Sequence, residues 1–165
     1  MGGKNKKTKQ NSNPDISTNK KAKRDYLIEE KYEAGIELVG TEVKSIRDKK
    51  VNIADSFARI EKGQCILYGC DIQPWQTAGE WFQHASKRPR RLLLHKKEIN
   101  TLAIQTQQKG YSIIALRMYW KGSRVKVELG LAKGKNQVDQ RHALKSRVEL
   151  MEAKREMARF NKGNY

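Results

Sequence analysis

The chain has 165 residues, and its 35 lysine and arginine residues outnumber its 18 acidic residues to give a formal net charge of +17. A charge this large favours a polyanionic partner, either a nucleic acid or an anionic membrane surface. A membrane-spanning helix needs about 18 consecutive apolar residues, and no apolar run in the sequence is that long. The basic N-terminus has no apolar segment of the kind found in a signal peptide.

Residues 1–18 form a basic N-terminal segment that we predict to be disordered. Its one large apolar residue is Ile16, so ordering would bury too little apolar surface to offset the lost conformational entropy. Residues 19–137 have the length and composition of one domain. Residues 138–165 form a basic C-terminal tail.

The domain begins with a predicted strand over residues 26–38. Gly35 favours a β-bulge within this strand, and Gly40 is expected to end it. Residues 41–48 then predict a short helix with Thr41 as its N-cap.

The middle of the domain alternates between short strands and irregular chain. Residues 56–61 and 65–68 predict two strands on either side of a lysine–glycine turn. Residues 73–91 have no regular pattern and are expected to hold one helical turn. Residues 96–108 predict an amphipathic helix that a glycine terminates.

Two adjacent strands near the end of the domain give the strongest pattern in the sequence. Residues 113–120 are almost continuously apolar, as in a strand buried on both faces. Residues 124–131 alternate between apolar and polar, as in a strand with one face in the core. Many short strands with a few small helices predict a mostly β fold, an OB-type closed β-barrel flanked by short helices.

The C-terminal tail has high helix propensity but a broken apolar stripe. Leu144, Val148 and Met151 share one helical face, and Arg155 interrupts it. A helix of this length is marginally stable alone in water. We expect the tail to become helical on binding a partner; a helix packed against the barrel is the alternative.

Catalytic and metal-binding patterns are absent from the sequence. His84, His95 and His142 lie in separate segments, and no nucleophile or metalloprotease motif includes them. Cys65 and Cys70 have no second cysteine pair, so a zinc site or disulfide framework is not indicated and reduced thiols are expected. We therefore predict a protein that is not an enzyme and binds no metal or cofactor.

The chemistry of the chain favours RNA or DNA as its partner. Lysine and arginine neutralise phosphates and release counterions, and exposed aromatic rings stack on bases. Tyr26, Tyr32, Trp75 and Trp81 are candidates for stacking, although each also suits a hydrophobic core. Membrane binding is disfavoured because neither tail has a wide apolar face. A general single-strand-binding OB module remains an alternative function.

Several sequence blocks together resemble the SsrA-binding protein (SmpB) family. The likeness runs through residues 19–135, and the blocks that carry it are NKKAKRDY (19–26), YEAGIELVGTEVKSIR (32–47), VNIADSF (51–57), RLLLHKKEI (91–99) and VKVELGLAKGK (125–135). This resemblance implies an OB-type barrel that binds the tRNA-like domain of transfer-messenger RNA. It also implies delivery of that RNA to stalled ribosomes for trans-translation, in the cytoplasm, by a monomeric adaptor without catalysis.

The resemblance also implies which residues bind RNA. Transferred to this sequence, they are Asn19, Lys20, Glu33, Gly35, Glu42, Lys44, Ser45, Arg47, Leu93, Lys126, Lys133, Gly134 and Lys135. The lysines and arginine of this set suit phosphate contacts. Glu33 repels phosphate, so we expect it to accept a hydrogen bond from a base or ribose, to anchor a cation, or to stabilise a turn. Leu93 also suits simple core packing.

The tail is implied to contact the small-subunit decoding centre and to occupy the empty mRNA path. The expected ribosome-contacting residues are Asp139, Arg141, Lys145, Arg147 and Met157. The tail departs from the usual family pattern, because Val138 and Gln140 stand where a histidine and a lysine are common.

Overall fold

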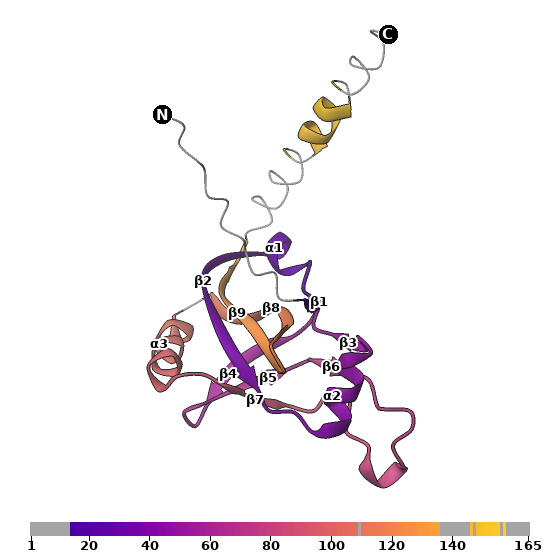
Figure 1. Cartoon of the computed structure of the whole chain (residues 1–165). Helices are drawn as coiled ribbons and strands as arrows, with labels where there is room; N and C mark the ends of the chain where they lie inside the picture. Colours follow the sequence, from indigo (N-terminus) through magenta and orange to yellow (C-terminus); the bar gives the residue numbers. More distant parts are fainter. Residues whose placement is uncertain (1–13, 109, 136–145, 147, 156, 158–165) are drawn as a thin grey trace, which may run out of the picture.

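The structure is a computed structural model that describes residues 14–108, 110–135, 146, 148–155 and 157 (Figure 1). Within these residues the fold is mostly β with small helices, as predicted. The strands are β1 (Asp15–Thr18), β2 (Tyr26–Ile36), β3 (Val51–Asn52), β4 (Phe57–Glu61), β5 (Gln64–Tyr68), β6 (Asp71–Ile72), β7 (Arg90–Leu93), β8 (Tyr111–Lys121) and β9 (Arg124–Gly134). The helical segments are α1 (Ala22–Asp25), α2 (Gly40–Arg47), the 3-10 helix η1 (Glu80–Phe82) and α3 (Lys96–Gln107).

Seven strands form one antiparallel sheet in the order β1-β8-β4-β5-β7-β2-β9, and β8 also pairs with β9. The pairing therefore returns to β8 after passing through β4, β5, β7, β2 and β9. Strands β3 and β6 form a separate two-stranded ladder. Figure 1 shows α3 beside one side of the sheet and α2 beside the other. The main core fills the interior, with Leu67, Leu102, Met118 and Leu129 all fully buried.

The predicted hairpin is the β8–β9 pair, and it has the predicted burial. Val127 and Leu129 on β9 are fully buried in the main core. On β8, Ile113 belongs to the main core, whereas Ile114 and Leu116 belong to a second cluster on the opposite face. Strand β8 is thus apolar at consecutive positions because both of its faces are covered.

The prediction of disorder through residue 18 is wrong for Asp15–Thr18, which form β1. This strand pairs antiparallel with β8 beyond the part that β4 occupies, so it satisfies backbone groups that β4 leaves open. Ile16 is buried with the main core. The composition of residues 15–18 did not predict this strand, because much of its stabilisation comes from pairing with the edge of β8 and not from its own side chains.

Two local predictions in the first half of the domain are also wrong. The irregularity of β2 lies between Ile28 and Glu30 and not at Gly35. Gly35 instead allows close packing, since a Cβ atom there would lie 3.2 Å from Cβ of Leu93. The N-cap of α2 is Val39 and not Thr41.

The other predicted elements are confirmed with small shifts of their ends. The strands predicted at residues 56–61 and 65–68 are β4 and β5, the helix predicted at 96–108 is α3, and the irregular segment contains the single turn η1. Cys65 and Cys70 are free and buried. Burial raises the pKa of the Cys65 thiol to about 12, so this thiol is neutral in the core.

Buried ion pairs connect α2 to the start of β7 and to the residues just before it. The carboxylate of Glu42 lies 2.7 Å from Arg88 and 2.8 Å from Arg90, and the side chains of Glu42 and Arg90 are both fully buried. Glu42 also accepts a 2.9 Å hydrogen bond from the backbone N–H of Val39, at the start of α2. Arg90 donates to the carbonyl oxygens of Cys70 and Ser86. Each buried charge therefore has several partners, as burial of a charge requires.

We predict that Glu42→Gln destabilises the protein by about 3 kcal/mol at pH 7, because it leaves the buried Arg90 without its counter-charge. Burial alone would raise the pKa of Glu42, but the hydrogen bonds from Arg88 and from Val39 N–H, with the charge of Arg90, lower it. The stabilisation is therefore fully present above the unfolded-state pKa of about 4.3 and is lost as pH falls through the lower folded-state value.

Urea unfolding as a function of pH tests this prediction. The difference between wild type and Glu42→Gln should narrow below about pH 4, where the native carboxylate begins to be protonated. The matched control is Glu37→Gln, which disrupts an exposed 3.5 Å pair with Arg91 and should cost less than about 0.5 kcal/mol. Equal stability losses in the two variants would contradict the prediction.

Candidate nucleic-acid interface

Four of the residues expected to bind RNA come together on neighbouring strands. In the strand register, Gly35 of β2 lies opposite Leu93 of β7 on one side and Lys126 of β9 on the other. Lys126 in turn lies opposite Tyr119 of β8. Glu33 is two residues before Gly35 and its carboxylate accepts a hydrogen bond from Tyr119 Oη. We call Glu33, Gly35, Leu93, Tyr119 and Lys126 the cross-strand surface; Glu33 and Leu93 are exposed, Lys126 is half-buried, and Gly35 and Tyr119 are buried.

Leu93 is an exposed apolar side chain within the cross-strand surface. It is 48% exposed, so the alternative of simple core packing is wrong. Its side chain lies against Gly35, where a Cβ atom would be 3.2 Å from Cβ and 3.5 Å from Cδ1 of Leu93. The glycine thus leaves room for the leucine at the surface, where an apolar side chain can contact a base or ribose face.

Glu33 is held by protein groups. Lys121 Nζ lies 2.7 Å from its carboxylate, and Tyr119 donates a second hydrogen bond. These two hydrogen bonds, from Lys121 first, lower the pKa of Glu33, so the carboxylate remains ionised at neutral pH. Glu33 therefore positions one lysine and one tyrosine hydroxyl, which matches the expectation of a cation anchor.

A second carboxylate accounts for the arrangement of the charged side chains around Glu33. Glu128 of β9 lies directly opposite Glu33 in the register, and like charges at opposed positions destabilise a sheet. Lys31 lies 2.9 Å and Arg117 2.5 Å from the Glu128 carboxylate. Each carboxylate is thus neutralised by its own cations, which allows the two glutamates to lie opposite each other on β2 and β9.

Helix α2 divides its predicted RNA-binding residues between two faces. Lys44 and Arg47 are exposed, and neither forms an ion pair with another described residue. Glu42 and Ser45 are fully buried, so direct RNA contact by these two is contradicted. Both point inward because the helix packs one face on the body, and Glu42 serves there as the counter-ion of Arg90.

Asn19 is also buried, and its side chain forms hydrogen bonds with backbone groups. Its side-chain amide donates to the carbonyl of Ala115 at 3.1 Å, and its oxygen accepts from the N–H of Ala22 at 3.1 Å. Asn19 therefore fixes the start of α1 against β8 and leaves Lys20, the next residue, exposed. Direct contact between the Asn19 side chain and RNA is thus contradicted, and its structural role is to present Lys20.

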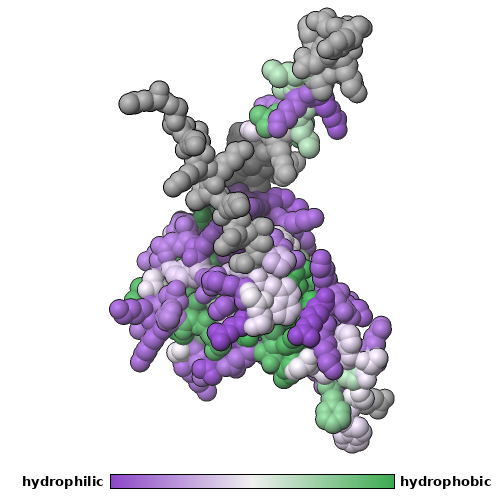
Figure 2. All heavy atoms as spheres, in the orientation of Figure 1, coloured by the Kyte–Doolittle hydropathy of each residue, from purple (hydrophilic) through white to green (hydrophobic). Residues whose placement is uncertain are grey.

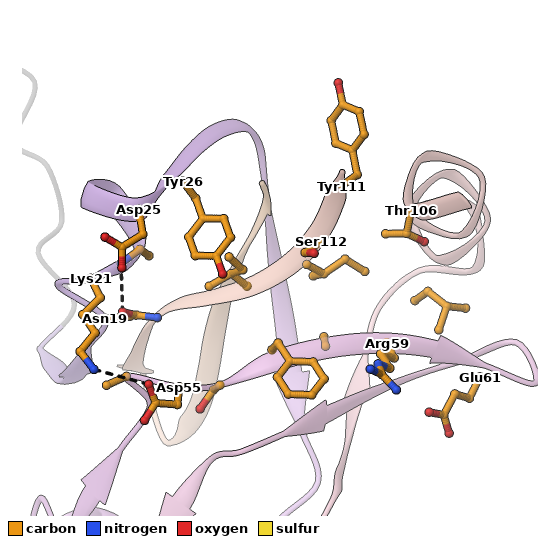
Figure 3. Close-up of a pocket in the computed structure, with 18 residues that line it drawn as sticks. Asn19, Lys21, Asp25, Tyr26, Asp55, Arg59, Glu61, Thr106, Tyr111 and Ser112 are labelled. Carbon is orange, nitrogen blue, oxygen red and sulfur yellow. Dashed lines mark hydrogen bonds and ion pairs between the residues drawn. The ribbon is translucent and has the colours of Figure 1, made fainter. Parts of the chain in front are cut away.

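A groove of about 680 Å³ lies beside these residues, between α1, β4 and β8 (Figure 3). Tyr26, Phe57 and Tyr111 line it. Lys133 Nζ is 5.6 Å from the centroid of the Tyr111 ring, and the guanidinium of Arg59 is 5.3 Å from that of Phe57. Cations held against aromatic rings are typical of surfaces that stack on nucleic-acid bases.

The sequence missed part of this groove. Tyr26 was a stacking candidate, and Lys133 was expected to bind RNA, but Phe57 and Arg59 were not identified. They are alternate outward positions on one short strand, for which the sequence predicted a strand and no function. The stacking of Phe57 on Tyr68, whose ring centroid is 5.7 Å from that of Phe57, depends on the pairing of β4 with β5.

The remaining predicted residues lie at the exit of β9 or in the tail. Lys133 and Gly134 are exposed, and Lys135 donates to the carbonyl of Lys23 at 3.0 Å. In the tail, residues 148–155 are helical and exposed, and Met157 is 72% exposed. The predicted contacts Asp139, Arg141, Lys145 and Arg147 lie outside the described residues.

The described residues contain no cluster of three or more histidine, cysteine, aspartate or glutamate side chains arranged to bind a metal ion. In the same part of the chain, no helix has the length and apolar character needed to cross a bilayer.

Comparison with known proteins identifies the family. The model of the SmpB protein family matches residues 16–159. An SsrA-binding protein from Shouchella clausii is 53% identical over 144 residues, which cover 87% of this chain and 89% of that protein. One from Bifidobacterium adolescentis is 49% identical over 148 residues, or 89% of this chain and 92% of that protein.

A solved structure agrees with these sequence relatives. It is described as "tmRNA-SmpB: a journey to the center of the bacterial ribosome", and it matches with a TM-score of 0.61 and 44% identity over 73% of this chain and 84% of the solved chain. The similarity thus extends over the described fold and beyond any single motif. The chain belongs to the SmpB protein family.

Proposed function

We propose that this chain binds transfer-messenger RNA through its tRNA-like domain and delivers it to stalled ribosomes for trans-translation. Family membership supports this function, since the relatives are named SsrA-binding proteins. The observation that carries the proposal is the cross-strand surface, where an exposed leucine, a lysine and a hydrogen-bonded tyrosine–glutamate pair lie side by side. Such a surface offers apolar contact and charge at fixed spacing.

The RNA contacts fall into two kinds. Lys20, Lys44, Arg47, Lys126 and Lys133 contact phosphates and supply the salt-dependent part of the affinity. Leu93 and the aromatic groove supply contacts to exposed bases and riboses, which depend on the folded shape of the RNA. Glu33, Gly35, Asn19, Glu42 and Ser45 support these groups from beneath or beside them, and Gly134 and Lys135 direct the chain away from β9.

The fold provides the rigidity that this arrangement needs. We propose that the strand pairing from β8 through β4, β5, β7 and β2 to β9 and back to β8 is an OB-type closed barrel. The barrel domain extends over residues 19–137, with β1 of the preceding segment added to its edge. In a closed barrel, strands distant in sequence are held at fixed register, so residues of β2, β7 and β9 form one surface.

The C-terminal tail is proposed to act on the ribosome. Residues 138–165 enter the empty mRNA path beside the decoding centre of the small subunit and become helical there. The helical residues 148–155 support this proposal, because their side chains are exposed and little of their apolar surface packs against the body. Asp139, Arg141, Lys145, Arg147 and Met157 are the proposed contacts.

The proposed protein is an adaptor without catalytic activity or cofactor, monomeric, and located with the ribosomes in the cytoplasm. The main alternative is a general single-strand-binding OB module, which the groove with its aromatic residues favours. The two functions differ in what they recognise. An adaptor distinguishes a folded tRNA-like RNA from an unstructured strand, whereas a general module binds both equally.

We predict tight binding of the full chain to a tRNA-like domain transcript at physiological salt and much weaker binding to an unstructured RNA of the same length. Lys126→Gln should weaken binding to the transcript about three- to tenfold and reduce the slope of log K against log salt by about one, because one phosphate contact is lost. Filter binding or fluorescence anisotropy over a salt series measures both quantities.

The matched control for Lys126→Gln is Lys97→Gln on α3, which removes the same charge from an exposed site outside the cross-strand surface. It should change the affinity less than twofold. Equal effects of the two substitutions would show that only overall charge matters. Equal affinity of wild type for both RNAs would favour the single-strand-binding module.

We predict that truncation after Lys135 leaves affinity for the tRNA-like transcript within about threefold of wild type but abolishes tagging of nascent chains on stalled ribosomes. The barrel and its RNA-binding residues remain, whereas the tail that fills the mRNA path is removed. Anisotropy and a reconstituted translation assay measure the two activities. A variant with the order of residues 136–165 scrambled, equal in length and charge, should also fail in tagging; normal tagging by the truncated chain would refute the proposal.

A further inference from the structure

A loop formed by residues 73–89 extends from the body beside α2 (Figure 1). Its tip is the single turn of η1, which presents Trp81 at 95% exposure and Phe82 at 77% exposure. Figure 2 shows pale and green spheres at this tip, with hydrophilic residues on the body beside it. Trp81 is the most exposed of the large apolar side chains described in the protein.

The loop is anchored, so the exposure of its tip is not a consequence of a loose segment. Gln83 Nε2 donates to the carbonyls of Trp75 at 2.6 Å and Ala78 at 2.9 Å, which closes the loop beneath the tip. His84 is buried, and its Nε2 donates to the carbonyl of Ile72 at 3.0 Å. The backbone that carries the two rings is thus held in place, which reduces the entropy lost on binding.

The returning arm of the loop is joined to α2. Nδ1 of His84 forms a 2.9 Å hydrogen bond with Thr41 Oγ1, and Arg88 is paired with the buried Glu42. The tip therefore has a defined position relative to α2, whose outer face carries Lys44 and Arg47. The loop is a rigid extension of a basic helix.

The charge beside the tip favours RNA over an apolar protein partner. Lys44, Arg47, Lys49 and Lys87 are exposed and form no ion pair with any other described residue. A fifth cation, Lys50, lies 5.8 Å from the centroid of the half-buried Trp75 ring and 3.9 Å from the carboxylate of Asp48. Unpaired cations on α2, together with exposed aromatic rings on the loop that is joined to this helix, match a strand whose phosphates are neutralised and whose bases are stacked.

We infer that Trp81 and Phe82 stack on unpaired loop bases of the tRNA-like RNA while its backbone lies along Lys44 and Arg47 of α2. This contact is separate from the cross-strand surface and from the tail. The identity of the RNA in this inference rests on the proposed function. A folded RNA exposes unpaired bases in its loops, bulges and ends. A contact to loop bases therefore depends on where the loop lies relative to the helices whose phosphates the cations bind.

The test is binding of the full-length chain to the tRNA-like domain transcript over a salt series. Trp81→Ala should weaken binding about tenfold with no change in the salt slope, because stacking releases no counterions. Trp81→Phe should recover most of the loss. Lys44→Gln should reduce the slope, so the two variants separate stacking from charge.

Two further measurements make the test specific. In chemical probing of the transcript, Trp81→Ala should expose one set of loop bases that wild type protects. The matched control is Ile104→Ala on α3, which removes an apolar side chain that is 64% exposed and should leave affinity and protection unchanged. Thermal unfolding of Trp81→Ala should match wild type, since this side chain supports no core.

Three outcomes would overturn the inference. Unchanged affinity and protection in Trp81→Ala would exclude stacking on this RNA. Unchanged RNA binding with weaker binding to purified small ribosomal subunits would assign the tip to the ribosome instead. An equal loss in Ile104→Ala would indicate non-specific adhesion. If the wild-type protein does not prefer the tRNA-like transcript over unstructured RNA, the proposed function itself fails. That outcome is seen in the wild type, whereas the other three are seen in the variants.

Discussion

Strand β8 is the element on which the rest of the structure depends, because it uses both edges and both faces. One edge pairs with β9 along its length, and the other is shared between β4 and β1. One face enters the main core and the other the second cluster. A strand in this position has no free backbone groups to satisfy elsewhere, so it fixes the register of its neighbours. The cross-strand surface follows from that register.

The second organising interaction is the buried pair of Glu42 and Arg90, which joins α2 to the start of β7. A buried ion pair adds little stability compared with apolar packing, but it tolerates few alternative geometries. Arg88 pairs with the same carboxylate and so joins it to the loop that carries Trp81 at its tip. One carboxylate thus positions a basic helix, a strand of the sheet and the root of an aromatic loop. This gives a physical reason for a buried glutamate in a strongly basic protein.

RNA recognition by this protein combines two requirements that conflict in a small domain. Binding a polyanion needs many cations, whereas a stable fold cannot keep like charges close together without cost. The structure meets both by pairing some cations with neighbouring carboxylates, as at Glu33 and Glu128, and leaving others unpaired on α2. The paired cations are held in position, and we propose that the unpaired ones contribute the salt-dependent affinity. In the same proposal, apolar groups such as Leu93 add contacts that salt does not weaken.

The sequence by itself determined the mostly β class, the β8–β9 hairpin, α3 and the family, because these depend on local periodicity and on motifs that are contiguous in the chain. The family resemblance also gave Lys44, Lys126 and Leu93 as RNA contacts, which remain a proposal. Only the tertiary structure decided that residues 15–18 form a strand, since their stabilisation comes from a distant edge of β8. It likewise decided that Glu42 and Asn19 are buried. Burial and hydrogen-bond partners are set by elements far apart in sequence, which no local pattern records.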